Sequence, residues 1–426
     1  MTPPTEPPAA AAAQPEGAAD AEGTTAPLTP LREPAEGIPD VVDTAPALAA
    51  IVTAFAAGTG PVAIDAERAS GFRYGQSAYL VQLRRAGAGT ALIDPQQLPD
   101  LSSLSEVLDG AEWVLHAASQ DLACLAEVHL VPTRLFDTEL AGRLLGRDRV
   151  GLGAMVASEL GLELAKEHSA ADWSTRPLPE AWLRYAALDV EVLVELRDRL
   201  AAELAETGKL EWALQEFEAV RTAPGPPPRR QPWRRTSGSH HVRDGLGLAI
   251  VRELWQTRED EARRADISPG RILSDAAIVA AATTKPTSMP ELAALRPFRH
   301  KAAARRTRIW FEAVTRACAL DPSEHPSRRG PATDTLPPPR AWKDRHPEAA
   351  ARLDVVRGTV RSLADQLQLP QENLLTPEYQ RRLAWEPPRH VSTQTVTETL
   401  TTLGARPWQT SLVAEPLASG LLHVHP

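Results

Sequence analysis

The sequence predicts a mixed α/β domain, with a sheet flanked by helices, followed by two all-α modules. Three apolar runs of strand length, at residues 62–67, 78–84 and 90–94, lie close together in the first quarter of the chain. Strand and helix patterns then alternate as far as residue 207, which is typical of a central sheet covered by helices. Beyond residue 244 the apolar spacing is helical, which predicts modules without strands.

The elements of the α/β domain follow from local signals. Thr44, Pro46 and Gly58 are a start, first-turn and stop signal for a helix over 44–57. Gly87 and Gly89 predict a tight turn, so the three apolar runs are expected to form an antiparallel meander. The remaining expected elements are a helix near 101–108, a strand at 112–116, a helix at 120–127 and further helices to 207.

Composition divides the chain into segments. Stretches rich in proline, alanine or arginine predict unstructured tails and linkers, because they bury little apolar surface. The expected segments are an acidic disordered tail (1–43), the α/β domain (44–220), a basic Pro-rich linker (221–243), a helical domain (244–320), a second Pro-rich linker (321–341) and a C-terminal helical domain (342–426).

Bulk properties favour a cytoplasmic protein. The net charge of −9 is dominated by the tail, which has eight acids and one base, so it does not exclude nucleic acid as a partner. Two distant cysteines, Cys124 and Cys318, indicate neither a disulfide framework nor a thiolate metal site. We find no signal-peptide pattern and no apolar run near the ~20 residues of a membrane span, so no membrane partner is expected.

Two carboxylates end the first predicted strand. Asp65 and Glu67 are two residues apart, so their side chains share one face of the strand. Like charges on one face are unfavourable unless a cation or hydrogen-bond donors neutralise them. The alternative is that Asp65 caps the strand while Glu67 is solvated.

Two further acids lie on apolar helix faces. Asp121 begins a predicted helix, where the helix dipole alone would also favour an acid. Asp189 interrupts the core face of a long helix, and Tyr185 lies one turn earlier on that face. A carboxylate there is costly unless it is paired or coordinated; a salt bridge from elsewhere is the alternative.

Taken together, the four acids predict a divalent metal site. Hard cations such as Mg²⁺ prefer oxygen ligands, and two ions roughly 3.5–4 Å apart can promote phosphodiester hydrolysis. We therefore expect divalent ions, not lysine or arginine, to balance the four charges. The sequence has no His/Cys set typical of zinc and no GxxxxGK[ST] stretch, so no nucleotide cofactor is expected.

Three motifs carry a family resemblance. "IDAE" (64–67), "LHAASQDL" (115–122) and "YAALD" (185–189) resemble the exonuclease motifs of the ribonuclease D family, in the tyrosine-bearing branch of the DEDD superfamily. Further on, residues 253–275 and 295–314 are similar to the helical domain shared by RecQ helicases and ribonuclease D, called HRDC. "LPQENLLTP" (369–377) resembles the second helical domain of actinobacterial-type ribonuclease D.

The resemblance implies an RNase-H-like exonuclease domain and a specific chemistry. Asp65, Glu67, Asp121 and Asp189 would hold two Mg²⁺ or Mn²⁺ ions, and Tyr185 would orient the attacking water. The implied reaction is 3′-to-5′ hydrolysis of RNA, releasing nucleoside 5′-monophosphates, with tRNA precursors or other structured RNA as substrates. The alternatives are a DNA exonuclease of repair and a non-catalytic nucleic-acid-binding protein.

Candidate RNA contacts lie in two places. Near the first motif, Phe72 and Tyr74 are candidates for stacking a base, and Arg73, Arg176 and Lys166 for contacting phosphate. The first helical domain has a basic cluster that could neutralise phosphates with little sequence preference, formed by Arg296, Arg299, Lys301, Arg305 and Arg306. Nothing in the sequence indicates an obligate protein partner.

Overall fold

The structure is a computed structural model, and it describes residues 27–164, 168, 170–225, 229–330 and 336–424. The disorder expected for residues 1–26 and the candidate Lys166 lie outside the described residues. Within them, no helix is long and apolar enough to span a membrane.

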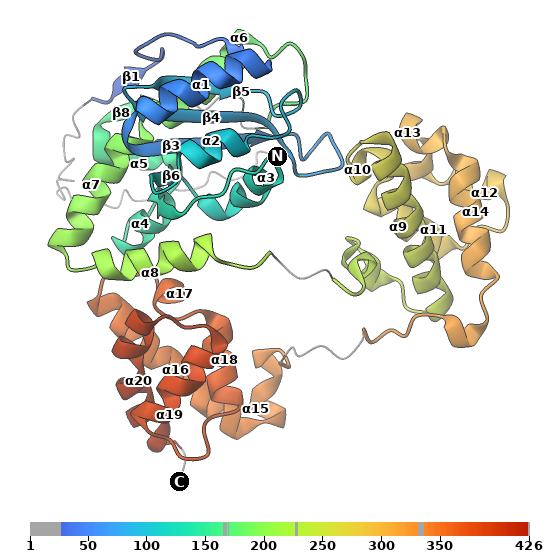
Figure 1. The fold of residues 1–426 in the computed structure, drawn as a ribbon. Coiled ribbons are helices and arrows are strands. Elements are labelled where there is room, and N and C mark those ends of the chain that lie inside the picture. The colour runs from blue at the N-terminus through green and yellow to red at the C-terminus, as the bar shows by residue number, and fades with distance from the viewer. Residues whose placement is uncertain (1–26, 165–167, 169, 226–228, 331–335, 425–426) are drawn as a thin grey trace, which may run out of the picture.

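A six-stranded mixed sheet forms the centre of the N-terminal part (Figure 1). Its strand order is β2-β5-β4-β3-β6-β7, and a separate parallel pair joins β1 to β8. The predicted meander is confirmed, because β3, β4 and β5 are antiparallel neighbours and Gly87 and Gly89 turn between the last two with positive φ. The strands are β1 (Thr29–Leu31), β2 (Val41–Val42), β3 (Thr59–Arg68), β4 (Ala78–Ala86), β5 (Gly89–Ile93), β6 (Glu112–Leu115), β7 (Arg134–Asp137) and β8 (Leu162–Leu164).

Helices cover this sheet, as the sequence predicts. They are α1 (Ala45–Ala57), α2 (Ser102–Val107), α3 (Leu122–Glu127), α4 (Thr138–Leu144), α5 (Leu152–Leu160), α6 (Glu180–Glu191), α7 (Leu193–Glu206) and α8 (Leu210–Arg221), with a short 3₁₀ helix η1 (Ala118–Gln120) before α3. Helix α6 packs against β3, β4 and β5, and α7 packs against β3 and β6. We call this part, from β1 to α8, the sheet domain.

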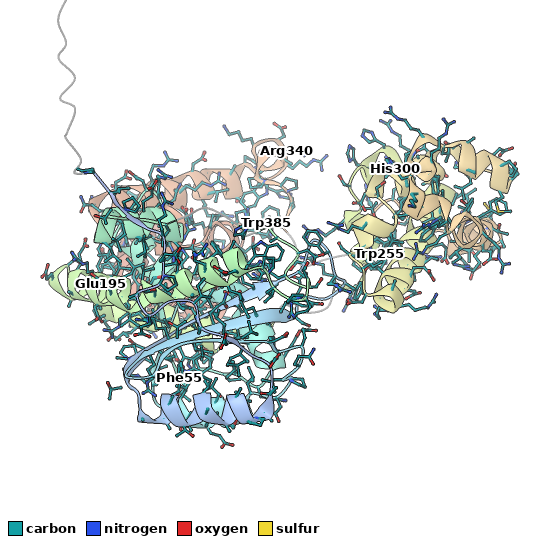
Figure 2. The ribbon with its side chains drawn as sticks, turned by 90° about the horizontal axis from the view of Figure 1, so that it is seen from above. Phe55, Glu195, Trp255, His300, Arg340 and Trp385 are labelled. Carbon is teal, nitrogen blue, oxygen red and sulfur yellow. The ribbon has the colours of Figure 1, made fainter. Side chains whose placement is uncertain are left out.

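The middle module is all-helical and has a hydrophobic core of its own. It consists of α9 (Gly245–Ala265), α10 (Pro269–Ile272), α11 (Asp275–Thr284), α12 (Met289–Ala294), η4 (Arg296–Arg299), α13 (Lys301–Ala304) and α14 (Thr307–Cys318). Leu254, Phe298 and Trp310 are buried in that core. Figure 2 shows this module, with Trp255 and His300, set to one side of the rest of the molecule.

The C-terminal module is also helical, but its core is continuous with that of the sheet domain. Buried residues of both parts, such as Val356 and Leu417 on one side and Leu144 and Phe217 on the other, belong to one cluster. Its helices are η6 (Pro339–Ala341), α15 (Trp342–Arg345), α16 (Pro347–Gln366), α17 (Gln371–Leu374), α18 (Pro377–Trp385), α19 (Thr393–Leu403) and α20 (Pro407–Leu422).

The segments predicted to lack structure are partly ordered, which corrects that expectation. Strand β1 pairs with β8 and strand β2 with β5, so the tail from residue 29 onward adds to the sheet domain. The first linker contains η2 (Pro232–Arg235) and η3 (Ser239–His241), and Trp233 is buried in the core of the middle module. In the second linker Pro322–Glu324 forms η5, and Leu336 packs against the larger core. A few large apolar side chains outweigh the average composition here.

Candidate active site

Strand β3 positions Asp65 and Glu67. It is a central strand, hydrogen-bonded to β4 on one side and β6 on the other, and Val62, Ala63 and Ile64 anchor it in the core. The two carboxylates follow at the end of this apolar run, with both side chains on one face. Glu67 is 8% exposed, which excludes the alternative of a solvated side chain.

Helix α6 positions Asp189 and Tyr185. Its residues 186–190 are buried against the sheet, and the two side chains lie one helical turn apart, as the sequence spacing predicts. The Tyr185 hydroxyl interacts with the carboxylate of Asp189; burial raises the pKa of Asp189 overall, and this interaction lowers it. Packing of α6 on β3 therefore places this pair beside the strand-end carboxylates.

Three of the four predicted carboxylates form one compact group. One carboxylate oxygen from each of Asp65, Glu67 and Asp189 lies within 4.8 Å of the others. The group has oxygen donors only, which is the set that Mg²⁺ and Mn²⁺ prefer. The residues that are present therefore fit a hard divalent cation.

The electrostatics of the group indicate an unbalanced negative site. Burial, followed by the charges of Asp65, Asp189 and Asp121, raises the pKa of Glu67 from 4.5 to about 10, and Arg68 only partly opposes this. Burial also raises the pKa of Asp65, and burial together with the charge of Asp65 raises that of Asp189. A cation bound among these oxygens would reverse the repulsion.

Asp121 lies in the same cavity but has a different partner. Its Oδ1 is 3.4 Å from Nη2 of Arg68, and its side chain is 7% exposed. Burial and the charge of Asp65 raise the pKa of Asp121 to about 8, whereas Arg68 lowers it. The expectation that no basic side chain balances the four acids is therefore wrong for Asp121. Arg68 is the charged neighbour of the site that sequence reasoning missed, although it directly follows Glu67.

A single cavity of about 330 Å³ brings the motif residues together. Asp65, Glu67, Asp121, Tyr185 and Asp189 all line it, so the three motifs converge in space. Several other residues complete its wall, among them Arg68, His116, Gln120 and Leu193.

His116 is held in a neutral form beside the carboxylates. Burial lowers the pKa of His116 to about 4, and its Nδ1 lies 2.9 Å from Oγ1 of Thr138. We interpret His116 as part of the supporting wall.

Hydrogen bonds within the protein occupy the guanidinium of Arg176. Its Nε and Nη2 donate to the two carboxylate oxygens of Asp94 at 2.6 and 2.8 Å, and Nη2 also donates to the Tyr79 carbonyl. Its Nη1 donates to the Trp173 and Thr175 carbonyls. This corrects its assignment as a phosphate contact, because the fork of the guanidinium is occupied.

The aromatic candidates near the first motif face the middle module. The guanidinium of Arg271 lies 4.1 Å from the centre of the Phe72 ring, and that of Arg263 lies 5.2 Å from the centre of the Tyr74 ring. Arg73 forms an ion pair with Asp266 of the same module at 3.2 Å. Sequence reasoning had no signal for these contacts, because their partners are about 190 residues away.

The basic cluster of the middle module is largely exposed. Arg296, Arg299, Lys301 and Arg305 are exposed, whereas Arg306 is half-buried. Nε of Arg306 is 3.3 Å from Glu261 Oε2, and Nη2 of Arg299 donates to the Ala294 carbonyl. The cluster therefore presents a basic surface on the part of the chain that has its own core.

Three family models match consecutive parts of the chain. A family described as "3'-5' exonuclease" matches residues 39–205, the HRDC domain matches residues 247–314, and a "3' to 5' exonuclease C-terminal domain" matches residues 335–421. These ranges follow the sheet domain, the middle module and the C-terminal module.

Curated relatives carry the name ribonuclease D. The proteins of that name from Gluconacetobacter diazotrophicus and Acidiphilium cryptum are 35% and 34% identical, over 55% and 61% of this chain. The aligned part of this chain spans 61% and 64% of the length of those relatives.

Solved structures share the whole fold. A protein from Bifidobacterium adolescentis is 40% identical with a TM-score of 0.84, covering 93% of this chain and 100% of the other. Escherichia coli RNase D, described as an exoribonuclease involved in structured RNA processing, has a TM-score of 0.65 at 24% identity, covering 91% and 99%. That likeness shows the fold alone. With the convergent motifs and the domain order, these likenesses identify the chain as similar to ribonuclease D.

Proposed function

We propose that the protein is a divalent-metal-dependent 3′-to-5′ exoribonuclease that releases nucleoside 5′-monophosphates from RNA 3′ ends. The observation that carries this proposal is the group of Asp65, Glu67 and Asp189 within 4.8 Å, in a cavity that Asp121 and Tyr185 also line. The similarity to proteins named ribonuclease D supports the reaction class.

The carboxylates are the proposed metal ligands. Asp65, Glu67 and Asp189 would hold one Mg²⁺ or Mn²⁺ ion, and Asp121 would join Asp65 in holding a second after leaving Arg68. When bound, such ions lower the pKa of water and stabilise charge on the leaving oxygen of a phosphodiester. The raised pKa of Glu67 means that binding a cation must displace a proton.

Tyr185 is proposed to orient the attacking water. Burial and the charge of Asp189 raise the pKa of its hydroxyl above the ordinary value, so the hydroxyl keeps its proton at neutral pH. A protonated hydroxyl can donate one hydrogen bond and accept another. We therefore assign Tyr185 a positioning role for the nucleophile, not the role of a base.

The substrate is proposed to be structured RNA, such as precursors of tRNA. The exposed basic cluster that includes Arg296, Lys301 and Arg305 can neutralise phosphates of the RNA body while the 3′ end enters the sheet domain. Maturation of tRNA 3′ ends is the process that this arrangement would serve.

The test uses 3′-end-labelled precursor tRNA and a matched DNA oligonucleotide with Mg²⁺, Mn²⁺ or a chelator. We expect labelled 5′-mononucleotides from the RNA with metal and none with chelator or with Asp189→Asn. The exposed substitution Glu195→Gln on α7 is the control for an unrelated carboxylate. Preferred digestion of the DNA would favour a repair exonuclease, and activity in the Asp189→Asn variant would contradict the proposed metal site.

A further inference from the structure

The loop between β3 and β4 is held by hydrogen bonds and a ring contact from the middle module. This loop, residues 69–77, begins directly after Glu67 and Arg68. The backbone N–H of Ser268 donates to the Phe72 carbonyl at 2.9 Å, and Nε of Arg271 donates to the Gly71 carbonyl at 2.7 Å. The Arg271 guanidinium also covers the Phe72 ring. Backbone groups of the loop are thus fixed from a module that is separate in sequence.

Asp266 makes two further contacts with this loop. Its Oδ2 is 3.2 Å from Nη1 of Arg73, and its Oδ1 accepts from the backbone N–H of Tyr74 at 3.3 Å. Nε of Arg73 donates to Ser174 Oγ at 2.8 Å, so Arg73 connects the middle module to the segment before α6. Asp266 ends α9 with a φ of 48°, and the helix end therefore sets the direction of its side chain.

The loop of residues 69–77 forms part of the wall of a second cavity beside the carboxylates. This cavity of about 280 Å³ is lined by Ser70, Gly71 and Phe72 of the loop and by Ala170 and Ala171. It shares Ala66, Glu67 and Arg68 with the cavity of the motif residues, so the two spaces adjoin along the end of β3. The position of the loop therefore sets the shape of the space next to the reacting centre.

The attachment of the module at this loop is polar and modest. The middle module has its own core. Among the described apolar residues of the sheet domain, Tyr74 packs against that core. Partly exposed ion pairs contribute little individually, about 0–1 kcal/mol. Such a contact can be weakened by one substitution without unfolding either part.

We infer that Asp266 and Arg271 are positioning residues for the exonuclease site: they hold the loop of residues 69–77 so that the nucleotide next to the scissile bond fits beside Glu67. The middle module then controls turnover directly, in addition to binding RNA. This inference rests on the proposed function. It differs from a role in RNA binding alone, because it applies to substrates too short to reach the basic cluster.

The test compares Asp266→Asn, Arg271→Gln and the double variant on a short RNA and on precursor tRNA. Asn tolerates the left-handed backbone of residue 266, so the first substitution keeps the helix end. Arg316→Gln is the matched control, since Arg316 contacts Glu253 and Thr257 within the middle module. We expect kcat/KM of the double variant on a five-nucleotide RNA to fall about tenfold, with the control unchanged.

Hydrogen exchange of residues 69–77 in the RNA-free protein is the second readout. We expect faster exchange in the double variant and unchanged exchange in the control. Loss of activity on precursor tRNA alone, with the short RNA and the loop exchange unaffected, would overturn the inference. If the native protein released no nucleotides from any RNA, the proposed function would fail, whereas the exchange measurement would still decide whether the module positions the loop.

Discussion

Neutralising Glu67 should stabilise the metal-free protein. In the absence of a cation, burial and three neighbouring carboxylates raise the pKa of Glu67 from 4.5 to about 10. The folded protein therefore keeps Glu67 protonated at pH 7, while the unfolded chain ionises it. Glu67→Gln keeps the shape of the side chain and removes this ionisation.

The magnitude follows from proton linkage. Protonating a group with an ordinary pKa of 4.5 at pH 7 costs about 3 kcal/mol, at about 1.36 kcal/mol for each pH unit. Between pH 4.5 and about 10 the folded state binds more protons than the unfolded state, so this group lowers stability as pH rises. Glu67→Gln should thus gain almost nothing near pH 4.5 and up to about 3 kcal/mol at pH 7.

The assay is thermal unfolding followed by calorimetry, in EDTA and at several pH values. Hydrogen exchange of the β3 amides identifies which unfolding transition belongs to the sheet domain. Glu195→Gln is the control, because Glu195 is 62% exposed. Mn²⁺ should raise the midpoint of the native protein more than that of Glu67→Gln, since the variant lacks a ligand. A Glu67→Gln midpoint that falls at pH 7, or rises equally at pH 5 and pH 8, would refute the reasoning.

Three further substitutions test the site and the basic surface. Tyr185→Phe should lower kcat about 100-fold and leave Mn²⁺ affinity in calorimetric titration nearly unchanged, because the role proposed for the hydroxyl is to orient water and not to bind the metal; a large loss of Mn²⁺ affinity would contradict this. Arg68→Gln removes the cation that competes for Asp121, so Mn²⁺ should bind at least about threefold more tightly; weaker binding would make Arg68 a supporting residue. Replacing Arg296, Lys301 and Arg305 by Gln should flatten the plot of log binding constant against log salt concentration for precursor tRNA, by the amount expected for the loss of about three phosphate contacts. An unchanged slope would remove the cluster from the RNA interface.

Local periodicity was sufficient to predict most of the fold and part of the site. Side chains two residues apart on a strand share a face, so the approach of Asp65 to Glu67 follows from sequence alone. Four residues on a helix bring Tyr185 to Asp189 in the same way. That the strand pair meets the helix pair depends on tertiary packing; in the sequence it was indicated by the cost of four uncompensated acids on apolar faces and by the family resemblance.

The failures of sequence reasoning share a physical cause. Arg68 turns to Asp121 rather than to solvent, and Trp233 enters a core from a segment whose composition predicts a flexible linker. Strand β1 pairs with β8, about 130 residues away. Each depends on a partner distant in sequence, and composition or spacing within a short window holds no information about such partners.

The two helical modules are attached to the sheet domain in different ways, and this difference bears on function. The C-terminal module shares its core, and Trp408 Nε1 donates to the buried Glu216 of α8 at 2.9 Å. Nζ of Lys209 donates to the carbonyls of Leu144 and Leu367, one on each side of the junction.

Close packing at that junction leaves little freedom. A Cβ on Gly146, whose φ is 76°, would lie 2.6 Å from the Gln368 carbonyl oxygen. Removing the C-terminal module would expose this apolar interface, so its contribution to RNA binding has to be tested by surface substitutions. The middle module contacts the loop of residues 69–77 through polar groups and the Phe72 and Tyr74 rings, and that loop lines the space beside Glu67. Because weak polar contacts can open and close without loss of a core, the contact of the middle module with this loop can open more readily than the junction with the C-terminal module.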